Sequence, residues 1–229
     1  MAKRIVFLPT DSSEKGFFDE VLVEFEWIPG IAISQAKKSI RNLHEAAKQE
    51  LGIDRVLEVS TRSEEVLGIA LSAFNLKIPV NGVEVSVESA YQASKFFQDG
   101  GPYLDILASS SLKAKKDPRL KTSGRLLGFS FDGLEWPMKS APNFYDYLFI
   151  SGLLQFPNRS FLSPYQAFTD IAFSQISLNY KSGRSYNCQA RSVAIYLSLR
   201  KQYSESHLLE ALKMQCLISD TTTEQLGLF

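Results

Sequence analysis

The sequence contains few of the residues that build metal and redox sites. Among its 229 residues are only two cysteines and two histidines. Cys188 and Cys216 do not have metal-binding spacing, and His44 has no second ligand four residues along its predicted helix, so we expect no metal site and no cofactor. Because no histidine stands in a motif that would activate Cys188, we expect a buried structural thiol there. Two unpaired cysteines are typical of a protein of the reducing cytoplasm.

Long apolar runs and net charge are also absent. Without an apolar run of signal-peptide or membrane-span length, we expect no association with a membrane. The 25 basic and 25 acidic residues cancel, so no overall field draws the chain onto nucleic acid, and such a contact needs a local patch. With 45% hydrophobic and 22% charged residues, the chain has enough apolar side chains for one packed domain.

The order of apolar and polar residues predicts an α+β fold with short N-terminal strands and hairpins. Strands are expected at 4–8, 21–27, 55–60 and 129–131, with a hairpin over 76–87 that turns at Asn81-Gly82. A helix is expected from Gln35 to Leu51, capped by Ser34 and closed by Gly52. The second half is predicted to be largely helical, over residues 104–116, 143–156, 161–173, 187–200 and 206–217, with a loop at 181–185 and Asn187 placed to cap the helix that follows. In the helix over 143–156, the residues expected to face inward are Tyr145, Leu148, Phe149, Gly152 and Leu153.

The stretch from Leu71 to Phe97 contains the most informative pattern. After the hairpin, Ser86 is placed to cap a helix that we expect to reach Phe97, and Glu88 falls in its first turn, where a carboxylate suits the helix dipole. Glu88, Gln92 and Lys95 stand at i, i+4 and i+7, so they share one face. Two interpretations remain open: a solvated surface helix, which the spacing alone favours, and the polar wall of a substrate cleft.

The same stretch resembles the NADAR family, whose members remove N-linked ADP-ribose from bases or cleave related N-glycosides. The likeness is carried by Ser72-Ala73-Phe74-Asn75 before the hairpin and by Ser86-Val87-Glu88 through Tyr91-Gln92-Ala93-Ser94-Lys95-Phe96 after it. The segments LSAFNL, ESAYQASK, GGPY, AKKDPRL, FTDI and NCQAR also follow one another as they do in the NADAR antitoxins encoded beside DarT-type DNA ADP-ribosyltransferase toxins. The resemblance runs from about Phe25 to Arg200.

This resemblance implies a single NADAR-like domain, which we place at residues 1–218 with an N-terminal extension. It implies an antitoxin N-glycosidase that removes ADP-ribose from guanine bases in DNA and so reverses the modification made by a DarT-type toxin. ADP-ribosylated DNA and the cognate toxin are then its partners. Two alternatives stay open: N-glycoside hydrolysis of a small metabolite, and a non-catalytic antitoxin that binds the toxin or the modified DNA.

The resemblance also assigns the catalytic candidates. Cleavage of an N-glycosidic bond develops oxocarbenium-like charge at the anomeric carbon, which a carboxylate stabilises. Glu88 is the candidate acid/base or electrostatic stabiliser. Lys95 is the candidate nucleophile, which would form a transient Schiff base with the opened ribose, and this requires a desolvated cleft that lowers its pKa. Lys95 as a cationic ligand of the pyrophosphate or ribose remains the other interpretation.

The substrate-binding candidates come from the family motifs and from the local chemistry of each residue. The chain from Lys95 to Arg125 has seven basic and three acidic side chains, which indicates either a solvated face or a seat for phosphates. Trp136 is either a core residue or a ring that stacks on a base. Asp170 lies between apolar neighbours and needs a partner. The full set is Ser72, Phe74, Asn75, Gln92, Arg125, Trp136, Asp170 and Asn187.

The end of the sequence, residues 219–229, is a polar spacer followed by an apolar pentapeptide. Gln225, Leu226, Leu228 and Phe229 resemble the Gln-Leu-x-Leu-Phe peptide that docks on bacterial DNA sliding clamps. Short motifs match by chance, and an apolar end that folds back onto the domain is the alternative interpretation. Clamp binding is therefore a hypothesis for a further partner.

Overall fold

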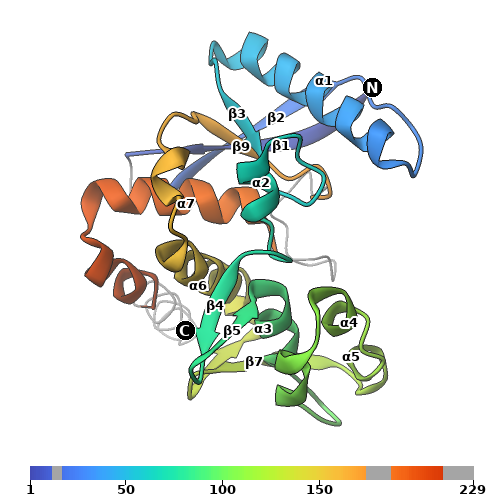
Figure 1. The fold of residues 1–229 in the computed structure, drawn as a ribbon, viewed down its shortest axis with the longest axis vertical. Coiled ribbons are helices and arrows are strands. Elements are labelled where there is room, and N and C mark those ends of the chain that lie inside the picture. The colour runs from blue at the N-terminus through green and yellow to red at the C-terminus, as the bar shows by residue number, and fades with distance from the viewer. Residues whose placement is uncertain (12–16, 174–186, 214–229) are drawn as a thin grey trace, which may run out of the picture.

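The computed structural model describes residues 1–11, 17–173 and 187–213 (Figure 1). The fold is α+β, as predicted, and its strands form a four-stranded sheet, a separate hairpin and a three-stranded sheet. Within the described ranges, the structure contains no helix with the length and apolarity that a membrane crossing requires. The predicted loop at 181–185, Cys216 and the clamp-like peptide from Gln225 to Phe229 lie outside these ranges.

The four-stranded sheet has the order β2-β1-β9-β3, and these strands span Phe18–Phe25, Ala2–Pro9, Ala167–Thr169 and Val56–Glu58. Successive residues of β1 pack into two different hydrophobic clusters. Val6 belongs to the cluster that contains Leu43 of α1, and Phe7 belongs to the larger cluster that contains Val193 of α7. Helices α1 (Ile33–Leu51) and α7 (Gln189–Gln202) accordingly cover opposite faces of the sheet (Figure 1).

The hairpin and the helix that follows it form as their local chemistry predicts. Strands β4 (Lys77–Val80) and β5 (Val83–Ser86) are joined by Asn81 and Gly82, whose φ angles of 51° and 78° match the turn that suits a right-twisted hairpin. Helix α3 (Val87–Ala93) begins after Ser86, whose side chain accepts a hydrogen bond from the Ser89 backbone N–H at 3.0 Å. The predicted cap is therefore confirmed.

Helix α3 ends at Ala93, so the prediction that it continues to Phe97 is wrong. Residues Lys95–Phe97 form strand β6, which pairs antiparallel with β7 so that Lys95 lies opposite Phe129. The Ser94 carbonyl already accepts a sheet-like bond from the Ser130 N–H at 2.7 Å. Pairing with a distant strand outweighs local helix propensity here, and it carries Lys95 off the helix.

A long apolar helix, α6 (Ala141–Gln155), packs against α3, α7 and β4. The predicted inward face of this helix is confirmed, since Tyr145, Leu148, Phe149, Gly152 and Leu153 are all buried. The other elements are α2 (Val66–Ala70), η1 (Leu104–Ala108), α4 (Ser111–Lys115), α5 (Arg119–Thr122), β7 (Leu126–Phe131), β8 (Leu134–Pro137), η2 (Met138–Ser140), η3 (Arg159–Leu162) and a helix over 205–213.

Two predicted helices of the second half are wrong. The segment 104–116 is split into η1 and α4. The segment 161–173 contains β9, which pairs parallel with β3 and meets β1 antiparallel at Phe7 and Phe168. A short apolar run fits a buried strand as well as a buried helix, and only its distant partners decide between them.

Two predicted helix caps also need correction. Helix α1 follows Ala32, and Ser34 lies inside its first turn. Helix α7 follows Cys188, so Asn187 lies one residue before the cap. On α1, His44 has a polar partner, because its Nε2 lies 2.9 Å from the Thr169 hydroxyl of β9. Cys188 is buried as predicted.

Candidate functional site

A cleft of about 850 Å³ lies where α3, β6 and α6 meet the ends of β3 and β9. Its wall takes residues from five of the six family-like segments; the sixth, GGPY at residues 100–103, does not line it. The lining residues with polar or aromatic side chains are Ser60, Thr61, Arg62, Ser72, Phe74, Glu88, Tyr91, Gln92, Lys95, Lys115, Arg125, Tyr145, Asp170, Phe173, Asn187 and Gln189.

The floor of the cleft is formed by buried polar side chains. Glu88 is 2% exposed and Gln92 is 5% exposed, and Gln92 Nε2 donates to Glu88 Oε1 at 2.9 Å. This is the i, i+4 contact that the spacing predicts. A carboxylate that is buried but open to the cleft on one side is available to a ligand. The structure therefore supports the cleft interpretation of this helix face.

Lys95 faces the same cleft from the first position of β6, and its Nζ lies 4.8 Å from the centre of the Tyr91 ring. Burial lowers the pKa of Lys95 from 10.5 to about 8; the nearby negative charge of Glu88 opposes this shift, and the positive charge of Lys115 adds to it. A substantial fraction of the amine is thus neutral near neutral pH, which is the condition for a nucleophilic lysine.

The rim of the cleft is basic. Arg62, Lys115 and Arg125 line it from three separate segments, and all three are exposed. Lys115 Nζ also lies 5.2 Å from the centre of the Phe74 ring. Arg119 of the same basic run has a different role, since it forms bidentate bonds with Asp105 and with Asp117. Cations at the rim above a carboxylate floor suit a ligand with phosphates at one end.

Asp170 closes the other end of the floor, just beyond β9. It is 6% exposed and accepts hydrogen bonds from Gln189 Nε2 at 3.1 Å and from the Ala172 N–H at 3.2 Å. Gln189 also bridges to the family-like turn, because its Oε1 accepts a bond from the Ala73 N–H at 2.6 Å. The buried Asp therefore has the partner that its apolar neighbours demand.

Two of the predicted binding residues lie away from the cleft. Trp136 is 5% exposed and packs against Phe144 and Tyr147, with ring centres 5.5 Å and 5.4 Å away, so its ring is part of the core and not free to stack on a base. Asn75 donates through Nδ2 to the Ile69 carbonyl at 2.8 Å and stabilises the turn after α2. Neither residue lines the cleft.

The cleft also contains residues that the sequence pattern did not single out as binding residues. Tyr145 was expected only in the core of α6, yet it lines the cleft at 1% exposure. Burial raises the pKa of Tyr145 well above 10, and the charges of Glu88 and Asp170 raise it further, so its hydroxyl stays a neutral hydrogen-bond donor. A helical period assigns such a residue to the inside of the protein without showing that a cleft opens there.

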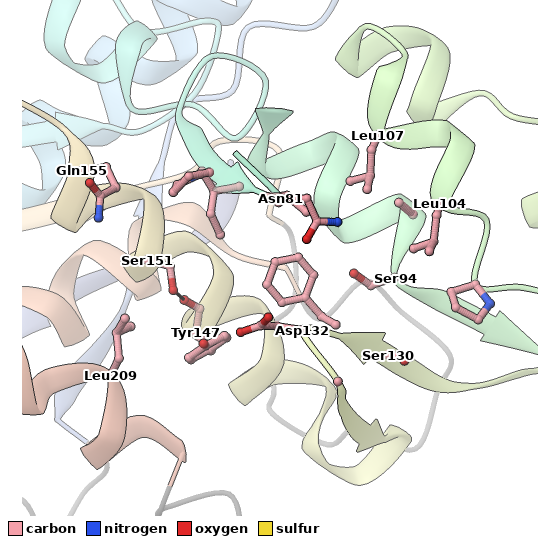
Figure 2. A pocket seen from close by; sticks show the side chains of 17 residues that line it. Asn81, Ser94, Leu104, Leu107, Ser130, Asp132, Tyr147, Ser151, Gln155 and Leu209 are labelled. Carbon is pink, nitrogen blue, oxygen red and sulfur yellow. Dashed lines mark hydrogen bonds between the residues drawn. The ribbon is translucent and has the colours of Figure 1, made fainter. Parts of the chain in front are cut away.

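A second hollow, of about 480 Å³, lies behind the end of α3 (Figure 2). Ala93 and Ser94 line it, whereas Gln92 and Lys95 line the larger cleft. Its polar side chains come from the two hairpin turns, from α6, and from Ser94 and Ser130, and no arginine or lysine is among the described residues that line it. The larger cleft is thus the better seat for an anionic ligand.

Comparison with known protein families matches residues 2–223 to the DarT1-associated NADAR antitoxins. A mixed α+β domain with this cleft therefore belongs to the NADAR class. More particularly, the chain belongs to the family of DarT1-associated NADAR antitoxins. The resemblance first seen from Phe25 to Arg200 is confirmed over nearly the whole sequence. Membership supports an antitoxin role and implies a toxin partner. No curated protein matches the chain with significant similarity.

Proposed function

We propose that the protein is an antitoxin N-glycosidase that removes ADP-ribose from guanine bases in DNA and so reverses the modification made by a DarT-type toxin. The observation that carries the proposal is a lysine with a lowered pKa beside a buried glutamate, at the floor of a cleft with a basic rim. Family membership supports the antitoxin role, and the charges of the cleft support the reaction.

The proposed binding mode follows from where the charges lie. The pyrophosphate of ADP-ribose binds at the rim, near Arg62, Lys115 and Arg125, because guanidinium and ammonium groups pair with phosphate oxygens. Phe74 offers a ring face for a base. The ribose that carries the glycosidic bond then reaches inward to Glu88 and Lys95.

The proposed reaction uses Lys95 as the nucleophile. Its neutral Nζ bonds to the anomeric carbon as the bond to guanine breaks, and the leaving base takes up a proton. Loss of a proton from the nitrogen and opening of the ribose ring give a Schiff base, and one water hydrolyses it to free ADP-ribose and lysine. Glu88 stabilises the positive charge that develops at the anomeric carbon, and Gln92 holds that carboxylate in place.

The first test is incubation of the full chain with single-stranded DNA that carries ADP-ribosyl-guanine. The wild type is expected to release free ADP-ribose. Lys95→Met keeps the length of the side chain and removes the amine, and it should slow release on the order of 10³-fold. Borohydride added during turnover should trap the wild type as a covalent adduct on Lys95, because it reduces the Schiff base.

Lys113→Met is the matched control, since Lys113 is an exposed lysine of α4 that does not line the cleft. It should leave the rate unchanged. If Lys95→Met raises KM but leaves kcat unchanged and no adduct forms, Lys95 is a ligand of the phosphates and not the nucleophile. If the modification stays on the DNA while the wild type binds it tightly, the protein shields the DNA and the proposed hydrolysis is wrong.

A further inference from the structure

A second buried carboxylate, Glu58, lies directly behind the cleft. It is the last residue of β3 and is 1% exposed. In the parallel pairing of β3 with β9 it stands beside Thr169, the residue before Asp170. Glu58 does not itself line the cleft, but Ser60 and Asp170, on either side of it in the fold, both do. Its neighbours are thus the segments that form this end of the cleft.

Glu58 binds both of those segments. Its Oε1 accepts a hydrogen bond from Ser60 Oγ at 2.6 Å, and its Oε2 lies 2.7 Å from Thr169 Oγ1. The Ile171 N–H points at both carboxyl oxygens, at 3.0 Å and 3.2 Å. One side chain therefore fixes the turn after β3 and the turn after β9 relative to each other. Asp170 lies within the second turn.

The hydrogen bonds around Glu58 can all be satisfied when it is a neutral acid. The Thr169 hydroxyl lies 2.9 Å from His44 Nε2 on α1. If Glu58 Oε2–H donates to Thr169, the Thr169 hydroxyl donates on to His44 Nε2, and Ser60 and Ile171 still donate to Oε1. This needs an uncharged imidazole with its proton on Nδ1. Burial and, to a smaller extent, the positive charge of Lys48 lower the pKa of His44 to about 4, against the opposing charge of Glu45, so the ring is uncharged at neutral pH.

Among the described residues, Asp170 has no comparable acceptor for a proton. Burial raises the pKa of Asp170 too, but the groups that bond its side chain, from Gln189 and the Ala172 N–H, are donors, and they and the positive charge of Arg62 oppose that shift. Burial and, to a smaller extent, the charge of Asp170 raise the pKa of Glu58 to about 7, against its hydrogen bonds with Ser60, Ile171 and Thr169. Of the two neighbouring carboxyl groups, Glu58 is the one beside a hydroxyl that can pass a hydrogen bond on to an acceptor, His44 Nε2, so its surroundings suit a proton better.

We propose that Glu58 is a positioning residue for the cleft, and that it works as a neutral acid with Asp170 as the single negative charge of the pair. In this state it clamps the two turns without placing a second negative charge beneath the anionic ligand. When Glu58 loses its proton, it still holds the two turns together, but it places a second negative charge beneath the ligand. The inference rests on the proposed function only in taking ADP-ribose as the ligand of the cleft.

The direct test is the affinity of the full chain for ADP-ribose at pH 6 and at pH 8.5, compared between the wild type and Glu58→Gln. Glutamine has the shape of the neutral acid and cannot ionise. The ratio of the two affinities should be close to one at pH 6. At pH 8.5 the wild type should bind roughly three- to tenfold more weakly than the variant. Taking the ratio cancels the titration of Lys95, which is present in both proteins.

A second arm needs no ligand and so separates a failure of this inference from a failure of the proposed function. Between pH 4.5 and about 7 the folded protein holds a proton on Glu58 that the unfolded chain has released, so stability falls as pH rises. The denaturation midpoint of the wild type should therefore fall relative to that of Glu58→Gln across this range. Glu84→Gln, at an exposed position of β5, should follow the wild type.

Glu58→Asp tests the clamp itself, because its carboxyl group is one methylene too short to reach both turns. It should lose affinity for ADP-ribose at both pH values; wild-type affinity in this variant would show that the clamp is unimportant. If Glu58→Gln is already weaker at pH 6, fails to fold where Glu58→Asp folds, or keeps the pH dependence of the wild type, Glu58 works as a charged carboxylate and the inference is wrong.

Discussion

The rate of ADP-ribose release should depend on pH through Lys95. With a pKa of about 8 the amine is about one tenth neutral at pH 7, whereas at the ordinary 10.5 it would be neutral in about three molecules in 10⁴. The cleft therefore raises the reactive fraction roughly 300-fold. If Lys95 is the nucleophile, the rate under saturating substrate should rise about tenfold from pH 6 to pH 7 and level off above pH 8.

The neighbours of Lys95 make this prediction sharper. The positive charge of Lys115 lowers the pKa of Lys95, so Lys115→Met should move the pH profile to higher pH. The negative charge of Glu88 raises that pKa, so Glu88→Gln should move the profile to lower pH, on top of any loss of rate. Opposite shifts from two lining residues are difficult to produce by general damage to the cleft.

The assay is single-turnover release of ADP-ribose from labelled single-stranded DNA between pH 5.5 and 9.5, with the protein in excess and saturating. Because Lys115 also lines the rim, Lys115→Met can weaken substrate binding. At saturation, weaker binding does not affect the rate, so the pH profile reports only the titration of the nucleophile. Lys113→Met is again the control and should keep the wild-type profile. A flat profile, or a shift to lower pH in Lys115→Met, would refute the assignment of Lys95 as a neutral nucleophile.

Two further predictions concern the floor and the core. Glu88→Gln should slow the chemical step by about 10²- to 10⁴-fold while changing ADP-ribose affinity only a few-fold, measured as kcat against Kd; a normal kcat would remove Glu88 from the mechanism. Arg191→Met leaves Asp146 buried without its ion-pair partner at 3.1 Å and should lower the free energy of unfolding, measured in urea, by about 3–5 kcal/mol. Arg159→Met breaks the more exposed pair with Glu205 and should lower it by about 1 kcal/mol or less. Equal losses in the two variants would contradict the difference in burial as the cause.

The parts of the fold that the sequence predicts are those whose chemistry is local. The Asn81-Gly82 turn needs only two residues that tolerate positive φ, and the Ser86 cap needs only a hydroxyl before a helix. The helix over 143–156 is long and apolar enough to be recognised alone. In each case the deciding interaction lies within a few residues of the one that it positions.

The elements that were mispredicted depend on distant partners. Strand β9 is three residues long and exists because β1 and β3, more than 100 residues earlier, offer their edges to it. Lys95 leaves the helical path because β7 pairs with it. No local pattern contains that information, since the free energy that decides between helix and strand comes from contacts that form only in the folded chain.

The site divides in the same way. The family motifs place Glu88, Gln92 and Lys95 at the cleft, and the structure agrees. They also suggested Trp136 as a ring that stacks on a base, but its ring packs against Phe144 and Tyr147 in the core. The hydrogen bonds of Glu58 with Thr169 and Ile171 join the ends of two strands that are far apart in the sequence, so they could not be anticipated from either segment alone.

The depth at which each charge lies explains how a chain with no net charge would act on ADP-ribosylated DNA, the substrate proposed above. The carboxyl groups of Glu88, Asp170 and Glu58 are buried at the floor or behind it, and the cations that line the cleft are exposed at its rim. An anionic ligand therefore meets positive charge first, and only its uncharged sugar reaches the carboxylates. A bare DNA backbone has no uncharged end to insert and gains only the rim contacts. Under the proposed function, selectivity for modified DNA would then come from the attached ADP-ribose, and a neutral Glu58, as proposed above, would keep the floor from repelling the group that the rim attracts.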